Sequence, residues 1–216
     1  MFKSIAPITI EKHKNVKVKQ IDNFDFAKNV NMASIMVHEF SRAASIYPIV
    51  FVEDKEKDMF KPVALFGFEE GENLFVDENS KWKSSYVPAI IRRYPFALAN
   101  TEVMERVKKY LAELQQMDAF TDEFCKFMVS KNMFTPLNMK IRVSNEIKNI
   151  SGAYIINEER LNTLSDETYL EMRTKKYIPV VYSHLSSLSQ IERLMGFKDE
   201  ELTVTETLSE HFSEEK

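Results

Sequence analysis

Apolar and polar residues alternate along one stretch in the second half of the chain, residues 137–143. In residues 137–143 the apolar positions are Leu137, Met139, Ile141 and Val143. An apolar residue at every second position is typical of a strand with one buried face. Residues 147–156 follow after the pair Asn145-Glu146, which suits a turn. We therefore expect the two stretches to pair as an antiparallel hairpin.

Shorter apolar runs in the first half of the chain, at residues 49–52, 62–68 and 74–76, are separated by charged turns. Closely spaced strands of this kind pair most simply as an antiparallel meander. Residues 5–19 also predict a strand, because valines alternate with lysines near its end. The basic face of this segment is either a solvated strand face or a docking edge for an acidic partner.

Apolar residues three and four positions apart predict helices elsewhere in the chain. The main ones span residues 31–46, 101–133 and 178–195. The first should end before Pro48, because the residue before a proline is pushed out of helical space. The second is either one bent helix or a pair broken near residues 117–121, and Gly196 should end the third. Shorter helices are expected at residues 88–94, 158–164 and 166–175.

These elements indicate a single α+β domain in which an antiparallel sheet of short strands packs against several helices. The sheet is expected to combine residues 5–19, 49–76 and 137–156. The domain is expected to span residues 1–197, and residues 198–216 an acidic, weakly ordered tail. We expect one core to receive Phe40, Ile49, Phe51, Leu65, Leu74, Tyr94, Ile141, Tyr154 and Leu188.

Composition excludes several classes of protein. The chain has 216 residues and four glycines, without the glycine cluster that a phosphate-binding or dinucleotide-binding loop requires. Its one cysteine, Cys125, excludes an internal disulfide and a multi-cysteine metal site. A net charge of −4 argues against a general nucleic-acid binder. We expect no cofactor and no nucleic-acid partner.

Hydropathy places the chain in solution. The N-terminal residues lack the apolar core of a secretory signal. No stretch approaches the roughly 18–20 apolar residues that cross a bilayer. A free cysteine fits a reducing compartment. We therefore expect a soluble, cytoplasmic protein without an integral membrane span.

The histidines and the cysteine give no recognisable catalytic or metal-binding pattern. His38-Glu39 lacks the second histidine of a zinc-binding H-E-x-x-H motif, so we expect a structural role for His38. Glu39 and Arg42, three positions apart, predict a salt bridge. Cys125 lies among apolar residues, which favours an inert buried thiol. His184 has serines close by on the same predicted helix, and capping or core polar contacts are favoured over a nucleophile–base pair.

The segment from Ile90 to Phe96, IIRRYPF, carries the most informative charges. Adjacent helical residues differ by about 100° in direction, so we expect one of Arg92 and Arg93 to be buried and the other exposed. A buried arginine needs a carboxylate, and Glu72 or Asp77 on the preceding turns would supply it. The alternative is that the arginines bind an anionic ligand or a carboxylate of a partner.

Several blocks of this sequence resemble the SapC family of bacterial proteins, in order along residues 5–197. In the first half they are FSRAA from Phe40, YPIVF from Tyr47, VALFG from Val63, GENLFV from Gly71, YVPA from Tyr86 and RRYPFAL from Arg92. In the second half they are GAY from Gly152, EERLN from Glu158 and YSHLSSL from Tyr182. One departure is that Ala99-Asn100 leads almost directly into the long helix, where many members carry an extra strand-rich stretch.

The resemblance implies two functions of different classes. The family is associated with bacterial surface layers, which implies a non-enzymatic accessory protein of surface-layer biogenesis or secretion that contacts a protein of that system. Its members also resemble proteins encoded beside halogenase-like and cupin-like enzymes. That implies an enzyme, or an enzyme's subunit, in a small-molecule or peptide-modifying system.

The family supplies no catalytic residues, so the candidate ligand or partner site rests on the residues of this chain alone. It consists of Arg92, Arg93, Tyr94, His184, Glu72 and Asp77. The sequence leaves open whether Arg92, Arg93, Tyr94 and His184 line one pocket, and it does not define the oligomeric state.

Overall fold

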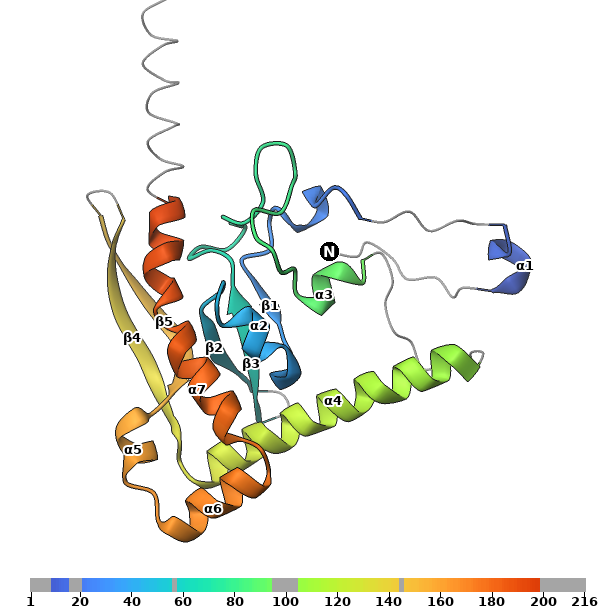
Figure 1. The fold of residues 1–216 in the computed structure, drawn as a ribbon. Coiled ribbons are helices and arrows are strands. Elements are labelled where there is room, and N and C mark those ends of the chain that lie inside the picture. The colour runs from blue at the N-terminus through green and yellow to red at the C-terminus, as the bar shows by residue number, and fades with distance from the viewer. Residues whose placement is uncertain (1–8, 16–20, 56–57, 95–104, 144–145, 199–216) are drawn as a thin grey trace, which may run out of the picture.

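A computed structural model describes residues 9–15, 21–55, 58–94, 105–143 and 146–198 (Figure 1). At the centre of the fold lies a five-stranded antiparallel sheet with the order β1-β3-β2-β5-β4. The strands are β1 (Met32–Ser34), β2 (Ile49–Asp54), β3 (Met59–Leu65), β4 (Phe134–Val143) and β5 (Glu146–Ile156). The predicted α+β class, with an antiparallel sheet packed against helices, is confirmed.

The remaining elements are short helices and one long helix. In the first half of the chain they are α1 (Ile10–His13), η1 (Asp25–Ala27), η2 (Val37–Glu39), α2 (Phe40–Ala43) and α3 (Ala89–Arg92). In the second half they are α4 (Glu105–Ser130), α5 (Glu158–Asn162), α6 (Asp166–Thr174) and α7 (Ile178–Ser187). After two turn residues the chain is helical again over 190–198. Gly196 lies inside that helix, so the prediction that it ends the helix is wrong.

The two hairpins follow the sequence pattern closely. Strands β2 and β3 pair from Ile49↔Ala64 to Asp54↔Met59, and β4 pairs with β5 over their whole lengths. A bulge interrupts the second ladder between Leu137 and Met139. The hairpins join where Phe51 pairs with Tyr154, so β4 is left as an edge strand of the sheet.

Three strand and helix predictions in the first half are wrong. Residues 10–13 form α1, and the other parts of the predicted strand, 5–8 and 16–19, lie outside the described residues. Residues 31–46 begin with β1, because Ala33 pairs with Ala64 of β3, and become helical only later. Residues 74–76 contribute only an isolated bridge between Val76 and Trp82.

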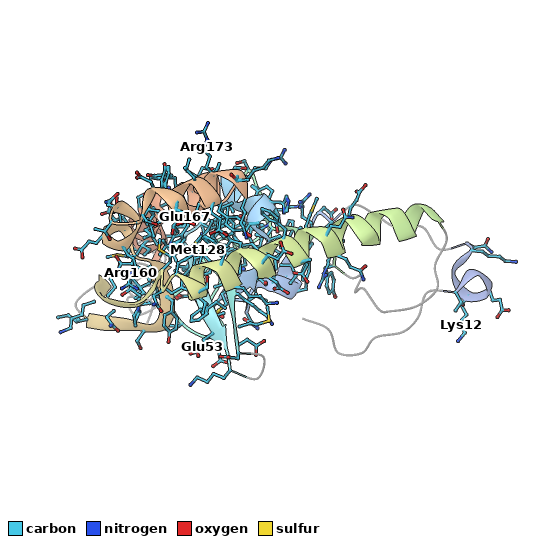
Figure 2. All side chains as sticks on the ribbon, turned by 90° about the horizontal axis from the view of Figure 1, so that it is seen from below. Lys12, Glu53, Met128, Arg160, Glu167 and Arg173 are labelled. Atoms are coloured by element: carbon cyan, nitrogen blue, oxygen red, sulfur yellow. The ribbon has the colours of Figure 1, made fainter. Side chains whose placement is uncertain are left out.

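The long helix α4 is continuous through residues 117–121, which decides between the two predictions made for it. Its C-terminal half packs against β3 and η2, and its other half extends past the sheet (Figure 1). Helix α7 packs against β2, β5 and α2. Side chains from all these elements form the core, and Figure 2 shows Met128 among them while Arg173 points out of the molecule.

Most of the predicted core is buried. Phe40, Ile49, Phe51, Leu65 and Leu74 are all buried in one cluster, and Tyr154 packs against it. Tyr94 and Leu188 are only half-buried. The side chain of Ile141 lies outside what the structure describes, as do residues 199–216 of the proposed tail 198–216; Lys198 itself is part of the helix at 190–198.

An aromatic cluster fastens the loop 66–86 to the sheet. The ring of Tyr47 makes edge contacts with Phe66 and Phe75 at centroid separations of 5.3 and 4.7 Å. The indole of Trp82 donates from Nε1 to the Tyr47 hydroxyl at 2.8 Å. The Tyr47 hydroxyl in turn donates to the Tyr86 carbonyl. Because aromatic burial and paired polar groups act together here, a segment without regular strands keeps one conformation.

Candidate functional site

Of the six predicted site residues, Arg92, Arg93 and Tyr94 are neighbours at the end of α3, and the other three lie elsewhere with contacts of their own. His184 is in the core, and Glu72 faces the end of the helix at 190–198. Asp77 closes a turn, with Oδ1 accepting from the Lys81 backbone N–H at 2.7 Å. Tyr94 stacks on Phe26 with a centroid separation of 3.8 Å. Each of these residues is best understood from its own contacts.

His184 joins α7 to the end of β5. Its Nε2 accepts from the backbone N–H of Ile156 at 3.0 Å, and Nδ1 has no hydrogen-bond partner among the described residues. The proton of the neutral ring is therefore on Nδ1. Burial lowers the pKa of His184 to about 3, with the backbone of Ile49 acting in the opposite direction. The ring is neutral at pH 7 and works as a structural acceptor.

Ser187, one turn further along α7, makes the second link between this helix and the sheet. Its hydroxyl donates to the carbonyl of His184 at 2.6 Å and accepts from the backbone N–H of Ile49 at 3.0 Å. The block YSHLSSL thus places two buried polar side chains, His184 and Ser187, against β5 and β2. This confirms the expectation of core polar contacts for His184.

The prediction for the arginine pair is wrong in two respects. Arg92 and Arg93 are both exposed, and Ile91 is the completely buried residue of α3. With Ile91 pointing inward, the next two residues point about 100° and 200° away from the core. Neither arginine forms an ion pair with a carboxylate of the described residues.

The proposed carboxylate partner Glu72 pairs with a lysine instead. Its Oε1 binds the ammonium group of Lys198, and both side chains are largely buried. Its Oε2 accepts from the backbone N–H of Phe68 at 2.8 Å. Gly67 is required beside it, because a Cβ at this position would stand 2.6 Å from the Glu72 carbonyl oxygen. Glu72 therefore holds its own turn and the end of the chain's last described helix.

A buried carboxylate that the sequence pattern did not reveal, Glu39, anchors α3. Its Oε1 accepts from the Tyr86 hydroxyl at 2.5 Å and from the Ala89 backbone N–H at 2.8 Å. Its Oε2 accepts from the Met36 backbone N–H at 3.1 Å. The predicted salt bridge between Glu39 and Arg42 is therefore wrong, because the carboxylate points inward.

Tyr86, which is held by Glu39, in turn contacts the arginine pair. The guanidinium carbon of Arg92 lies 5.5 Å from the centre of the Tyr86 ring, a cation–π contact. Burial, together with the hydrogen bond to Glu39, raises the pKa of Tyr86 above its usual value, and the charge of Arg92 opposes this. The hydroxyl therefore stays protonated and keeps donating to Glu39 at neutral pH.

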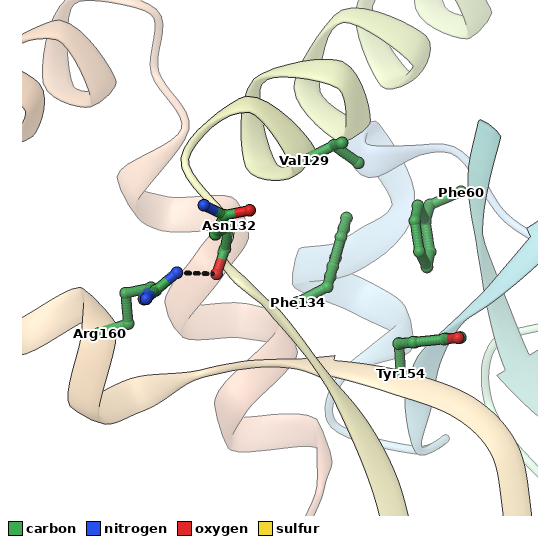
Figure 3. Close-up of a pocket in the computed structure, with 6 residues that line it drawn as sticks. All are labelled: Phe60, Val129, Asn132, Phe134, Tyr154 and Arg160. Carbon is green, nitrogen blue, oxygen red and sulfur yellow. Dashed lines mark hydrogen bonds between the residues drawn. The ribbon is translucent and has the colours of Figure 1, made fainter. Parts of the chain in front are cut away.

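A groove of about 450 Å³ opens where the C-terminal end of α4 meets the sheet (Figure 3). Phe60 stacks on Phe134 with a centroid separation of 4.6 Å and meets Tyr154 edge-on at 4.9 Å. Val129 stands at the rim with 45% of its surface exposed. Figure 3 shows Asn132 and Arg160 on the same rim, joined by a 2.9 Å hydrogen bond from the guanidinium to the Asn132 carbonyl.

Reactive groups are buried or solitary in the part of the chain that the structure describes. Burial raises the pKa of the Cys125 thiol to about 12, with Asp122 acting in the same direction, so the expected inert thiol is confirmed. The His38 ring lies 5.2 Å from that of Phe120. Among the described residues, no group of three His, Cys, Asp or Glu side chains could hold a metal ion. None of their helices combines the length and apolar character that a bilayer crossing requires.

Comparison with known proteins gives one match. A family model described as SapC matches residues 8–101 and 99–194. No curated protein and no solved structure matches the chain.

Proposed function

Because the chain belongs to the SapC family, we propose that it is a non-enzymatic accessory protein of bacterial surface-layer biogenesis or secretion. It acts in the cytoplasm by binding a protein of that system. The surface that we assign to this contact is the arginine pair of α3, Arg92 and Arg93, with Tyr94 beside it.

The observation that carries this proposal is the exposure of both arginines on a firmly anchored turn. A surface arginine without a carboxylate partner has its donors available for a partner protein. Glu39 fixes the first residue of α3 through Ala89, and it fixes Tyr86, on whose ring Arg92 lies. The loss of side-chain entropy on binding is therefore smaller for Arg92 than for a free arginine.

The chemistry of the pair indicates an acidic partner surface. The guanidinium group presents parallel N–H donors that match a carboxylate in a two-bond arrangement. Tyr94, stacked on Phe26, adds a rigid aromatic ring next to the charges. Arginine and tyrosine are also the residues most often found to dominate the energy of protein–protein contacts.

The test is a comparison of two variants in cells that carry a surface layer. The double change Arg92→Ala and Arg93→Ala should leave the melting temperature near that of the parent, because both side chains are exposed. It should abolish recovery of surface-layer or secretion components in a pull-down under mild conditions. Arg173→Ala, at an exposed arginine of α6, is the control and should recover them like the parent.

Two outcomes would contradict the proposal. One is equal recovery of these components by the double variant and the parent. The other is that the parent itself recovers no surface-layer or secretion component, which would remove the assigned partner class as well as the surface.

A further inference from the structure

The groove at the end of α4 has an aromatic floor and a charged rim, and none of its residues belongs to the arginine surface of α3. Its residues come from five elements or their ends: Phe60, Val129, Asn132, Phe134, Tyr154 and Arg160. Because Phe60 and Tyr154 are half-buried and Val129 is 45% exposed, apolar surface remains open to solvent here. A volume of about 450 Å³ is within the range of small-ligand sites.

Arg160 gives this groove its charge. Of the five N–H donors of its guanidinium group, one is used by the carbonyl of Asn132, and no described carboxylate pairs with it. Lys131, which precedes Asn132, is by contrast paired with a carboxylate, because its ammonium lies 3.7 Å from Glu171. The rim therefore offers one positive charge with unused donors, at an edge of the apolar surface.

A second charge, on Glu53, makes the two sides of the groove electrostatically different. The Tyr154 hydroxyl donates to Oε2 of Glu53 at 3.4 Å, so a negative charge lies beside Tyr154. An anionic group is repelled from Glu53 and attracted to Arg160, while an apolar group can rest on the rings between them. The opening suits a single carboxylate attached to an apolar body.

Addition of a partner strand is disfavoured at this place. Pro136 lies near the start of the edge strand β4 and has no backbone N–H, and the bulge after Leu137 interrupts the ladder next to it. A ligand therefore has to be held by the side chains of the groove.

We propose that this groove binds a small hydrophobic monocarboxylate, with an aromatic or bulky aliphatic group on Phe60, Phe134 and Tyr154 and the carboxylate on Arg160. The two ligand parts use contacts of different kinds, ring packing for the body and charge-assisted hydrogen bonds for the carboxylate. Removing the charge of either partner should therefore weaken binding without abolishing the apolar contact.

The experiment titrates the full-length chain, labelled with nitrogen-15, with three probes followed by NMR. The probes are N-acetylphenylalanine, its uncharged amide, and a six-residue peptide that ends in phenylalanine. We expect the free acid to shift the signals of Val129 and Tyr154 and to bind about tenfold more tightly than the amide. The variant Arg160→Gln should bind both at the affinity of the amide, while Arg173→Gln should behave like the parent.

A second variant keeps the proposal testable if Arg160→Gln unfolds. Val129→Asp places a negative charge at an exposed rim position and should reduce binding of the acid more than binding of the amide. Equal binding of acid and amide to the parent would overturn the proposal, as would an unchanged preference in Arg160→Gln or the absence of shifts at the groove. Binding of the peptide without the free acid would overturn the small-ligand class and assign the groove to the end of a partner polypeptide.

Discussion

At the scale of single residues, His184 makes the stability of the protein depend on pH. Its folded pKa, about 3, is below the usual value of 6.5, because burial disfavours the charged ring. Below pH 6.5 the unfolded chain takes up a proton that the folded chain does not, so this contribution to stability is lost as the pH falls from 6.5 towards 3. Above pH 6.5 it is fully present.

The prediction is that His184→Gln flattens the pH dependence of unfolding. The variant keeps an acceptor for the Ile156 N–H but has no proton to gain, so its unfolding free energy should change less between pH 6.5 and 4.5 than that of the parent. Urea unfolding at several pH values measures this. An equally steep slope in His184→Gln and in the parent would contradict the assignment.

At the scale of elements, the carboxylate of Glu39 connects η2 to α3. Two variants that remove different numbers of its hydrogen bonds should lose different amounts of stability. Glu39→Ala leaves the Met36 and Ala89 backbone N–H groups and the Tyr86 hydroxyl without their acceptor. Each buried donor left unpaired costs about 1–3 kcal/mol, so we expect a total loss of at least about 3 kcal/mol. Tyr86→Phe removes one donor together with its need for a partner and should cost about 1 kcal/mol.

Denaturant unfolding of both variants measures this difference. If Glu39→Ala and Tyr86→Phe lose the same amount of stability, the backbone contacts of Glu39 do not matter and α3 is held by Ile91 alone. If Arg92→Ala keeps the parent's melting temperature while Glu39→Ala loses much stability, Glu39 stabilises the turn that carries Arg92 and the Arg92 side chain itself does not stabilise the fold.

At the scale of the whole molecule, the last described helix belongs to the core. Ile191 and Leu194 are buried, Phe197 meets Phe75 edge-on at 5.4 Å, and Lys198 pairs with Glu72. A chain shortened to residues 1–198 keeps these contacts, and we expect it to unfold at the same denaturant concentration as the full chain. A chain shortened to residues 1–189 loses them.

The shorter chain should therefore be destabilised by several kcal/mol, since burial of each large apolar side chain contributes about 1.5–3 kcal/mol. Thermal and chemical unfolding of the two shortened chains against the full chain makes the comparison. Equal stability of the chains 1–189 and 1–198 would show that the helix does not stabilise the fold. A marked loss in the chain 1–198 would move the domain boundary beyond residue 198.

Local patterns predicted the parts of the fold that local interactions determine. The hairpin of β4 and β5 follows from alternation in residues 137–143 and the turn after them, and the hairpin of β2 and β3 from two apolar runs around a charged turn. Local spacing predicts helix where β1 forms, because this strand depends on pairing with Ala64, 31 positions away from Ala33. The spacing of apolar residues within one segment does not show a pairing partner so far away in the sequence.

The sites were harder to predict than the fold for the same reason. The groove combines Phe60 with Tyr154 and Arg160, which no motif connects. The sequence IIRRYPF does not show which residue of α3 points inward, and because Ile91 occupies that direction both arginines point outward. Glu39 stands just before the block FSRAA, and Tyr86 begins the block YVPA; only the fold shows that Glu39 holds Tyr86.

The aromatic cluster around Trp82 has a practical consequence. The chain contains one tryptophan, so its intrinsic fluorescence comes from a single known place. That indole donates to Tyr47 and lies 6.3 Å from Phe75, the ring on which Phe197 rests. Fluorescence excited at wavelengths that tyrosine does not absorb therefore reports on the place where the last described helix packs. The protein carries its own optical reporter of whether this end of the chain is docked or released.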